Sequence, residues 1–175
     1  QPVHELPDIR WKDLGQHISS IVPLDENESI IQAIGVEKFD GTNEYILTVT
    51  KNGQVKRSPL KDYQVSRYSK AMSTMKLKGD DEVISAQLVT ENGEIVLTSN
   101  TSYTVRFDME ELPPTGVKTG GVKGLVLKDG EYVVATNVIM PNEEKDVIVV
   151  THRGAVKRMN ITELEQTGRA KRGLV

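Results

Sequence analysis

Residues 50–63 read TKNGQVKRSPLKDY, and this stretch occurs twice more, as SNTSYTVRFDMEEL at 99–112 and THRGAVKRMNITEL at 151–164. The three copies align without a gap, and each follows a run rich in β-forming residues. The matched arginines Arg57, Arg106 and Arg158 are 49 and 52 residues apart. A period of about 50 residues is typical of propeller-like β arrays.

A second block repeats with the same period. Residues 82–86 align with 131–135, and more loosely with 29–33, which places their alanines 53 and 49 residues apart. Two blocks that recur in phase indicate one structural unit, because chance similarity would not keep a common spacing.

Each unit is predicted to be a four-stranded β element. In the first unit, 45–50 and 54–58 form a hairpin around Asn52-Gly53, a pair that suits tight hairpin turns, and 83–88 adds a further strand. Arg153-Gly154 and Thr101-Ser102 occupy the same turn position later. We therefore expect an all-β fold in one partial array of about three to four units, which divides as follows: 1–40, the end of a preceding unit; 41–92 and 93–143, two units; 144–175, the start of another.

The amino-acid composition excludes several classes of site and of protein. The chain of 175 residues has no cysteine, which excludes a thiol nucleophile, a cysteine zinc site and disulfides. No apolar run is long enough for a transmembrane helix, and no signal peptide is expected at the N-terminus. The formal net charge is −3, and it is unevenly distributed: −6 over residues 1–44, −1 over 45–144 and +4 over 145–175. A basic surface can coexist with this acidic total if the two signs lie on different faces.

No catalytic, cofactor or metal site is expected. The histidines at 4, 17 and 152 lack metal-ligand spacing, and Ser19-Ser20 lacks a nucleophile-elbow context. The glycine-rich stretch 116–124 does not match a phosphate-binding P-loop, and no helix is expected after it.

The basic residues are the candidate binding groups. Lys56-Arg57 and Lys157-Arg158 stand at equivalent strand positions, with Arg106 between them, so a repeat would place cations in a row along a phosphate backbone. Further cations lie in the segments between units. Aromatic residues are few, which favours contact with duplex DNA over stacking on single strands. The candidate DNA-binding residues are Lys56, Arg57, Arg67, Lys70, Lys76, Arg106, Lys118, Lys123, Arg153, Lys157, Arg158, Arg169, Lys171 and Arg172.

The strand–turn–strand pattern ILTVTKNGQVKR at 46–57, repeated about every 50 residues, resembles the C-terminal repeats of type IIA topoisomerase A subunits. The resemblance covers residues 28–175 most clearly, and 131–175 is close in type to the topoisomerase IV branch of Gram-positive bacteria. It implies a β-pinwheel, a propeller-like ring whose blades exchange a strand with their neighbours. It also implies that the chain binds duplex DNA along its outer rim and bends it.

The resemblance further implies a bacterial, cytoplasmic, nucleoid-associated parent enzyme of two A and two B subunits. That enzyme decatenates and relaxes DNA with ATP and magnesium, while this piece carries no cofactor and no catalytic residue. Gyrase instead wraps DNA with a Gln-Arg-Arg-Gly-Gly-Lys-Gly box. The nearest stretches here, 116–124 and 168–173, lack the full motif, which favours topoisomerase IV. The alternatives are a gyrase-type wrapping domain and a protein-interaction platform that uses the acidic residues 1–44.

Overall fold

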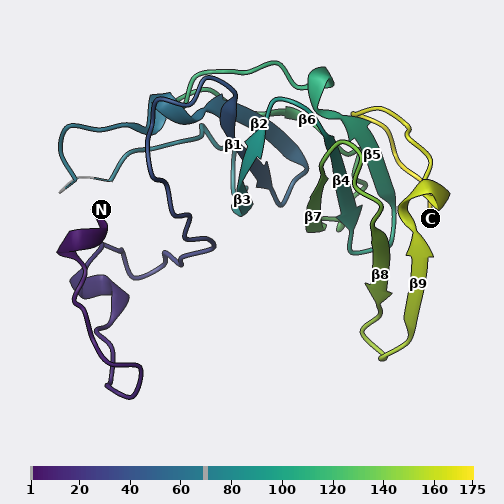
Figure 1. Cartoon of the computed structure of the whole chain (residues 1–175). Helices are drawn as coiled ribbons and strands as arrows, with labels where there is room; N and C mark the ends of the chain where they lie inside the picture. The colour runs from purple at the N-terminus through teal and green to yellow at the C-terminus, as the bar shows by residue number, and fades with distance from the viewer. Residues whose placement is uncertain (1, 69–70) are drawn as a thin grey trace.

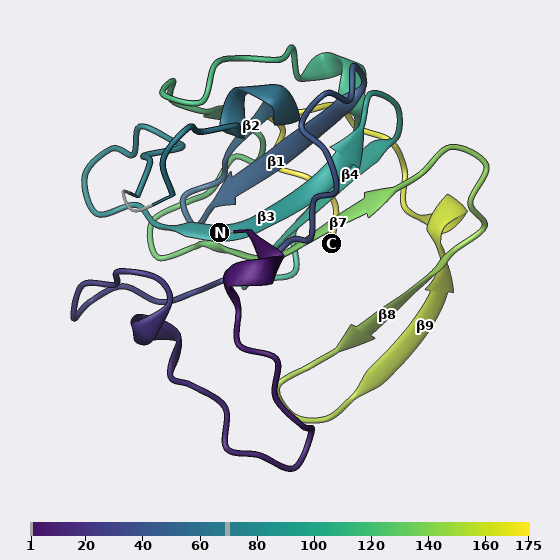
Figure 2. The ribbon, with the colours of Figure 1, turned by 60° about the vertical axis from the view of Figure 1, so that its left-hand side comes forward.

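The computed structural model describes residues 2–68 and 71–175, and it confirms the predicted all-β repeat architecture. Two antiparallel sheets and a separate hairpin follow one another along an arch (Figure 1). Among the described residues no helix is long and apolar enough to cross a membrane. Figure 2 shows the two sheets side by side, with the hairpin projecting away from them.

The first sheet has the order β3-β1-β2-β6. Strands β1 (Glu44–Thr50) and β2 (Gln54–Pro59) form the central hairpin, and β3 (Val83–Thr90) pairs with the free side of β1. The fourth strand, β6 (Val122–Lys123), comes from the second unit and pairs with β2. The two units therefore share a sheet, as the resemblance implied.

The second sheet repeats this plan in the order β5-β4-β7. Its strands are β4 (Glu94–Ser99), β5 (Thr104–Asp108) and β7 (Val133–Ile139). Leu174 bridges to Thr104 of β5, just as Val122 pairs with Val55 of β2. The third unit thus lends a short extended segment to the second sheet.

The third unit is a hairpin of β8 (Asp146–Val150) and β9 (Val156–Asn160). Within the described residues, no strand pairs with the outer edge of β8 in the way that β3 pairs with β1 and β7 with β4.

The three hairpins turn in the same way although their turn residues differ. Gly53, Ser102 and Gly154 occupy the same repeat position, and all three have positive φ angles, of 78°, 71° and 80°. Glycine adopts this conformation without strain, whereas serine does so at some cost. A 3-10 turn follows each hairpin, namely η3 (Leu60–Tyr63), η4 (Met109–Glu111) and η5 (Ile161–Glu163).

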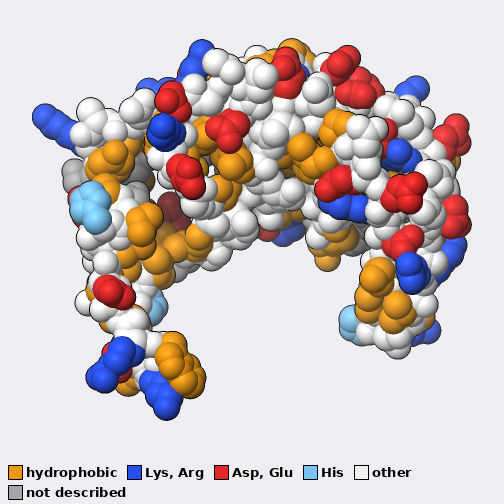
Figure 3. Space-filling view, in the orientation of Figure 1, with side chains coloured by type: hydrophobic (Ala, Val, Ile, Leu, Met, Phe, Trp, Pro, Cys, Tyr) orange, Lys and Arg blue, Asp and Glu red, His pale blue; other side chains and the backbone are white. Residues whose placement is uncertain are grey.

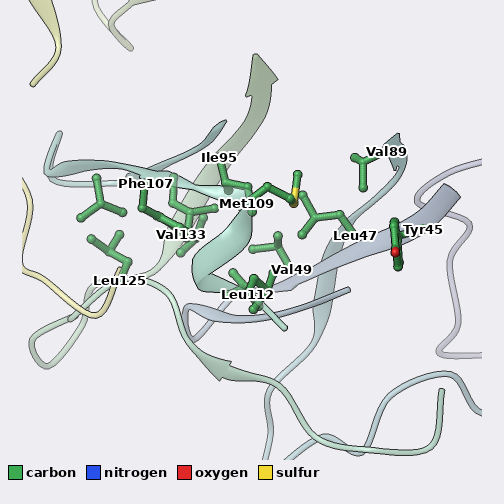
Figure 4. Packing of buried hydrophobic residues seen from close by; sticks show 13 residues of the cluster. Tyr45, Leu47, Val49, Val89, Ile95, Phe107, Met109, Leu112, Leu125 and Val133 are labelled. Carbon is green, nitrogen blue, oxygen red and sulfur yellow. The ribbon is translucent and has the colours of Figure 1, made fainter. Parts of the chain in front are cut away.

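One hydrophobic core joins the two sheets, as Figure 4 shows. Leu47 and Val49 of β1 face Ile95 and Phe107 of the second sheet, and all four side chains are fully buried. A Cβ atom on Gly124 would lie only 2.7 Å from Leu97 and 2.8 Å from Val55, so only glycine fits between the sheets at that point. The packing fixes the angle between the first two units.

Residues 2–43 contain two short 3-10 turns, η1 (Val3–Glu5) and η2 (Ile18–Ser20), and no strand. This segment hangs from one end of the arch, opposite the hairpin β8–β9 (Figure 1). Several of its apolar side chains are exposed, most clearly Trp11 at 88% and Leu14 at 99%.

Candidate nucleic-acid interface

The first predicted strand cation, Lys56, lies inside the molecule. Its side chain is 2% exposed, and its ammonium donates hydrogen bonds to the carbonyl oxygens of Thr74 at 2.5 Å and Val117 at 2.6 Å. The carbonyl oxygens of Gly116 and Thr119 lie slightly farther away. Burial lowers the pKa of this ammonium. Lys56 therefore fastens two loops together and presents no charge to solvent.

The repeated arginines of the first two units bind the unit that follows. The Arg57 guanidinium donates to the carbonyls of Leu112 and Glu91 and stacks over the Tyr45 ring, and the residue is 5% exposed. Arg106 donates to Leu164 O at the equivalent position, at a distance of 2.8 Å.

Arg106 makes two further contacts, which hold it in place. It donates to the carbonyl of Ile161 at 2.8 Å and forms an ion pair with Glu94 at 2.7 Å. Its side chain is 16% exposed. Each arginine thus joins its own strand to the 3-10 turn of the next unit. The side chains of Lys56, Arg57 and Arg106 are therefore too buried to contact a phosphate.

The same two positions are exposed in the third unit. Lys157 lies on the surface of β9, and the side chain of Arg158 is 75% exposed. Among the described residues, Arg158 bonds only to Asp146 of its own hairpin, with Nε donating to the carboxylate at 2.7 Å. Arg153, at the tip of the hairpin, is exposed as well.

Two arginines of the C-terminal loop act as anchors. Arg172 pairs with Glu131 and stacks on Tyr103 at 3.6 Å from the ring centroid, and Glu131 has its pKa lowered to about 2, chiefly by hydrogen bonding to Arg172. Arg169 donates to Glu111 O at 3.0 Å. These bonds fix the loop and leave Lys171 between them exposed.

The remaining predicted loop cations are exposed: Arg67, Lys76, Lys118 and Lys123. Lys70 lies outside the described residues. The loops that carry them, 64–79, 113–124 and 166–175, contain nine lysines and arginines and no aspartate or glutamate. Local charge in these loops is therefore uniformly positive, although the chain as a whole carries −3.

The three loops adjoin one another in order. The first meets the second where Lys76 N donates to Thr119 O at 3.1 Å, directly beside the carbonyls that Lys56 holds. Arg67 and Lys118 line one open hollow of about 560 Å³ at this junction. The second meets the third where Ala170 N donates to Gly124 O at 2.7 Å.

These loops run along the outer side of the arch in Figure 1. In Figure 3, blue and red side chains are interspersed over most of the visible face, so positive charge does not cover that face. We define the rim loops as residues 64–79, 113–124 and 166–175, and they are the strongest candidate for a phosphate-binding surface.

Sequence reasoning named every cation of these loops except Lys78, which is also exposed. It also named Lys56, Arg57 and Arg106 as surface contacts, although the structure buries most of these three side chains. One signal was present in part: the loop cations lie in stretches without acidic residues, whereas Lys56 and Arg106 directly follow the buried valines Val55 and Val105 in β-forming runs.

Comparison with known proteins shows the family to which the chain belongs. The family model described as the DNA gyrase C-terminal domain, β-propeller, matches residues 1–37, 44–90, 93–140 and 145–175. The A subunit of DNA topoisomerase 4 from Bacillus subtilis (strain 168) is 42% identical over 174 residues, which is 99% of this chain and 21% of that protein. Its counterpart from Staphylococcus epidermidis is 39% identical over 173 residues, again 99% of this chain and 21% of the relative.

Solved structures agree. A structure described as the C-terminal domain of DNA topoisomerase IV has a TM-score of 0.92 and 48% identity, and the match covers 99% of this chain and 53% of that one. A DNA gyrase A C-terminal domain shares the fold, with a TM-score of 0.76 at 24% identity, over 91% of this chain and 52% of that one. The chain thus spans about a fifth of the curated subunits and about half of the solved domains.

Proposed function

Because the chain belongs to the family of DNA gyrase C-terminal β-propeller domains, we propose that it binds and bends duplex DNA as part of a topoisomerase IV A subunit. The observation that carries the proposal is the set of rim loops: their sequences contain no carboxylate, and six of their cations, Arg67, Lys76, Lys78, Lys118, Lys123 and Lys171, are exposed.

The chemistry of these loops suits phosphates. Lysine and arginine side chains on exposed loops pair with the backbone of DNA and release its counterions, so binding depends steeply on salt and little on sequence. Gly116 in the second loop has no atom within 4 Å of the position of a Cβ atom, which leaves room for a backbone to approach there. The chain has only eight aromatic residues, which is a poor basis for stacking single-stranded bases.

Bending follows from the curved arrangement. The three loops are carried on successive units of an arch, and bonds between the loops fix their spacing. A duplex that touches all three must follow the curve, and the deformation energy is repaid by the additional phosphate contacts. In the parent enzyme, such bending would select and present segments for decatenation and relaxation.

The parent's remaining properties belong to the same proposal. We expect the chain to act within a cytoplasmic, nucleoid-associated assembly of two A and two B subunits, whose other domains use ATP and magnesium. This chain's own contribution is to hold DNA, and the residues that we assign to contact are Arg67, Lys76, Lys78, Lys118, Lys123 and Lys171, with Arg153 and Lys157 as peripheral additions.

Fluorescence anisotropy with a labelled duplex of mixed sequence, titrated at increasing salt, tests the proposal. We expect log affinity to fall linearly with log salt, with a slope of about −0.9 for each phosphate contacted. A second duplex of unrelated sequence should bind equally well. An absence of binding at low salt would refute the proposal and favour a protein-interaction platform.

Bending is tested separately by energy transfer between dyes at the two ends of the duplex. The transfer efficiency should rise when the protein binds, because a bent duplex brings its ends closer. Unchanged transfer under saturating binding would remove bending from the proposal and leave binding intact.

A further inference from the structure

The rim loops bond to one another at two places, which we call the first joint (loops 64–79 and 113–124) and the second joint (loops 113–124 and 166–175). The second joint is made by the main chain. Ala170 N donates to Gly124 O at 2.7 Å, and Val126 N donates to Lys171 O at 2.8 Å. These two bonds show how neighbouring loops of the repeat can be joined without a lysine.

Repeat positions match the two joints to each other. The turn after each joint aligns through its Leu-Lys pair, at 77–78 and 127–128, and the strand contacts align Val122 with Leu174. The matched positions are Thr74 with Gly124, Lys76 with Val126, Lys118 with Ala170 and Thr119 with Lys171.

The first joint keeps one of the two main-chain bonds and replaces the other. Lys76 N donates to Thr119 O at 3.1 Å, as its counterpart does. Thr74 O, however, accepts from the ammonium of Lys56 at 2.5 Å instead of from Lys118 N. Lys56 therefore takes the place of a main-chain donor, and the N–H of Lys118 has no acceptor among the described residues.

The same ammonium orients two peptide groups of the second rim loop. Val117 O accepts from Lys56 Nζ at 2.6 Å and Gly116 O at 3.4 Å. In a planar trans peptide, the N–H points opposite to the C=O. The N–H groups of Val117 and Lys118 therefore point away from the buried ammonium, and neither donates to any described residue.

These two donors lie in an accessible turn. Thr119 N donates to Gly116 O at 3.1 Å, and neither Val117 nor Lys118 has a positive φ, so the turn is of type I. The exposed side chain of Lys118 lines, with Arg67, the open hollow of about 560 Å³ at the first joint. Two free N–H groups and a cation thus share one turn.

We propose that the turn 116–119 is a phosphate-binding site of the rim and that Lys56 is its positioning residue. The N–H groups of Val117 and Lys118 donate to a phosphate beside the Lys118 ammonium, and the buried Lys56 keeps these donors turned outward. The inference rests on the proposed DNA binding and deepens it. The second joint has no counterpart, because Val105 stands at the repeat position of Lys56 and Ala170 N is already bonded.

Val117→Pro tests the main-chain donors. Proline is favoured at the second position of a type I turn and has no N–H, so the variant removes one donor and keeps the turn. In anisotropy titrations with a labelled duplex, we expect the affinity to fall about 5-fold. The slope of log affinity against log salt should not change, because no charge is removed.

Lys118→Gln gives the opposite signature. It removes a cation from the same turn, so the slope should fall by about 1 together with the affinity. Lys128→Gln is the matched control, since Lys128 is exposed and lies outside the rim loops. It should keep both the affinity and the slope of the unmodified chain.

Lys56→Met tests the positioning. Loss of the ammonium frees Thr74 O, so the N–H of Lys118 can turn inward to it, as at the second joint. We expect DNA affinity to fall about 10-fold. Val117→Pro should then cost less than about 1.5-fold in the Lys56→Met background, because the donors no longer face the phosphate. A merely structural role of Lys56 would leave the effect of Val117→Pro unchanged.

The outcomes separate the site from the proposed function. Circular dichroism and a thermal midpoint above the assay temperature show that each variant is folded, and Val117→Pro in the otherwise unmodified chain tests the site whether or not Lys56→Met folds. Unchanged affinity for Val117→Pro would overturn the site, and an equal cost in both backgrounds would overturn the role of Lys56. Either result leaves the proposed function intact if the unmodified chain binds DNA, whereas no binding by that chain would refute both.

Discussion

Lys56-Arg57 in β2 and Lys157-Arg158 in β9 are the same two residues at the same position of the repeat, in opposite surroundings. The first pair is 2% and 5% exposed and binds backbone carbonyls of later segments. The second pair is exposed, and in the part of the chain that the structure describes Arg158 bonds only to Asp146. The difference lies in whether another unit packs alongside. A recurring cation in a repeat array can therefore record how the units are joined rather than what they bind.

The largest expected effect is on the free energy of unfolding, and it should differ between variants of Arg106 and Arg158. Arg106→Ala would leave the Glu94 carboxylate and two carbonyls without their partner, at a cost of about 3 kcal/mol in the free energy of unfolding. Arg158→Ala, at the equivalent exposed position, should change it by less than about 0.5 kcal/mol. Urea denaturation followed by circular dichroism gives both values, and equal costs would contradict the difference in roles.

A smaller effect is expected for the lysine of the pair. Lys56→Met keeps the length of the side chain but removes the charged donor from two buried carbonyls, at a cost of about 2 kcal/mol. Because these carbonyls lie in two rim loops, DNA affinity should also fall. Lys157→Met is the matched control for stability, and it should not change the free energy of unfolding.

The smallest effect concerns pH and the anchor of the C-terminal loop. Pairing with Arg172 lowers the pKa of Glu131 from 4.5 to about 2, so this carboxylate stabilises the fold fully above its unfolded pKa. That stability is lost as the pH falls from about 4.5 toward 2. Thermal denaturation across this range should show a shallower acid dependence for Glu131→Gln. An identical dependence for both proteins would show that the anchor is not formed in solution.

The repeat made most of the fold predictable. The hairpins, the roughly 50-residue period and the third strands follow from β-forming runs, turn residues and their recurrence. The positive φ angle of Ser102 follows from alignment with Gly53, although serine alone would not indicate it. The conformation of residues 2–43 was less predictable. A β-strand needs a neighbouring strand, and none of the described residues pairs with this segment in a sheet.

The candidate site was predictable only in part. Exposed loop cations such as Lys118 and Lys123 were identified from the sequence, because they lie in a glycine-rich stretch that has no acidic residue. The roles of Arg57 and Arg106 were not, since their partners are main-chain carbonyls more than 50 residues away. Every residue has a carbonyl, so no sequence pattern identifies the one that an arginine binds.

The most direct test compares the salt dependence of DNA affinity for two triple variants of equal charge. Lys76, Lys118 and Lys123 changed to Gln remove rim-loop cations, while Lys12, Lys38 and Lys128 changed to Gln remove cations elsewhere. We expect the rim-loop variant to bind roughly 30-fold more weakly and to lose about 3 from the slope of log affinity against log salt. The other variant should keep both values close to those of the unmodified chain. Equal losses in the two variants would contradict the account that the rim loops contact DNA.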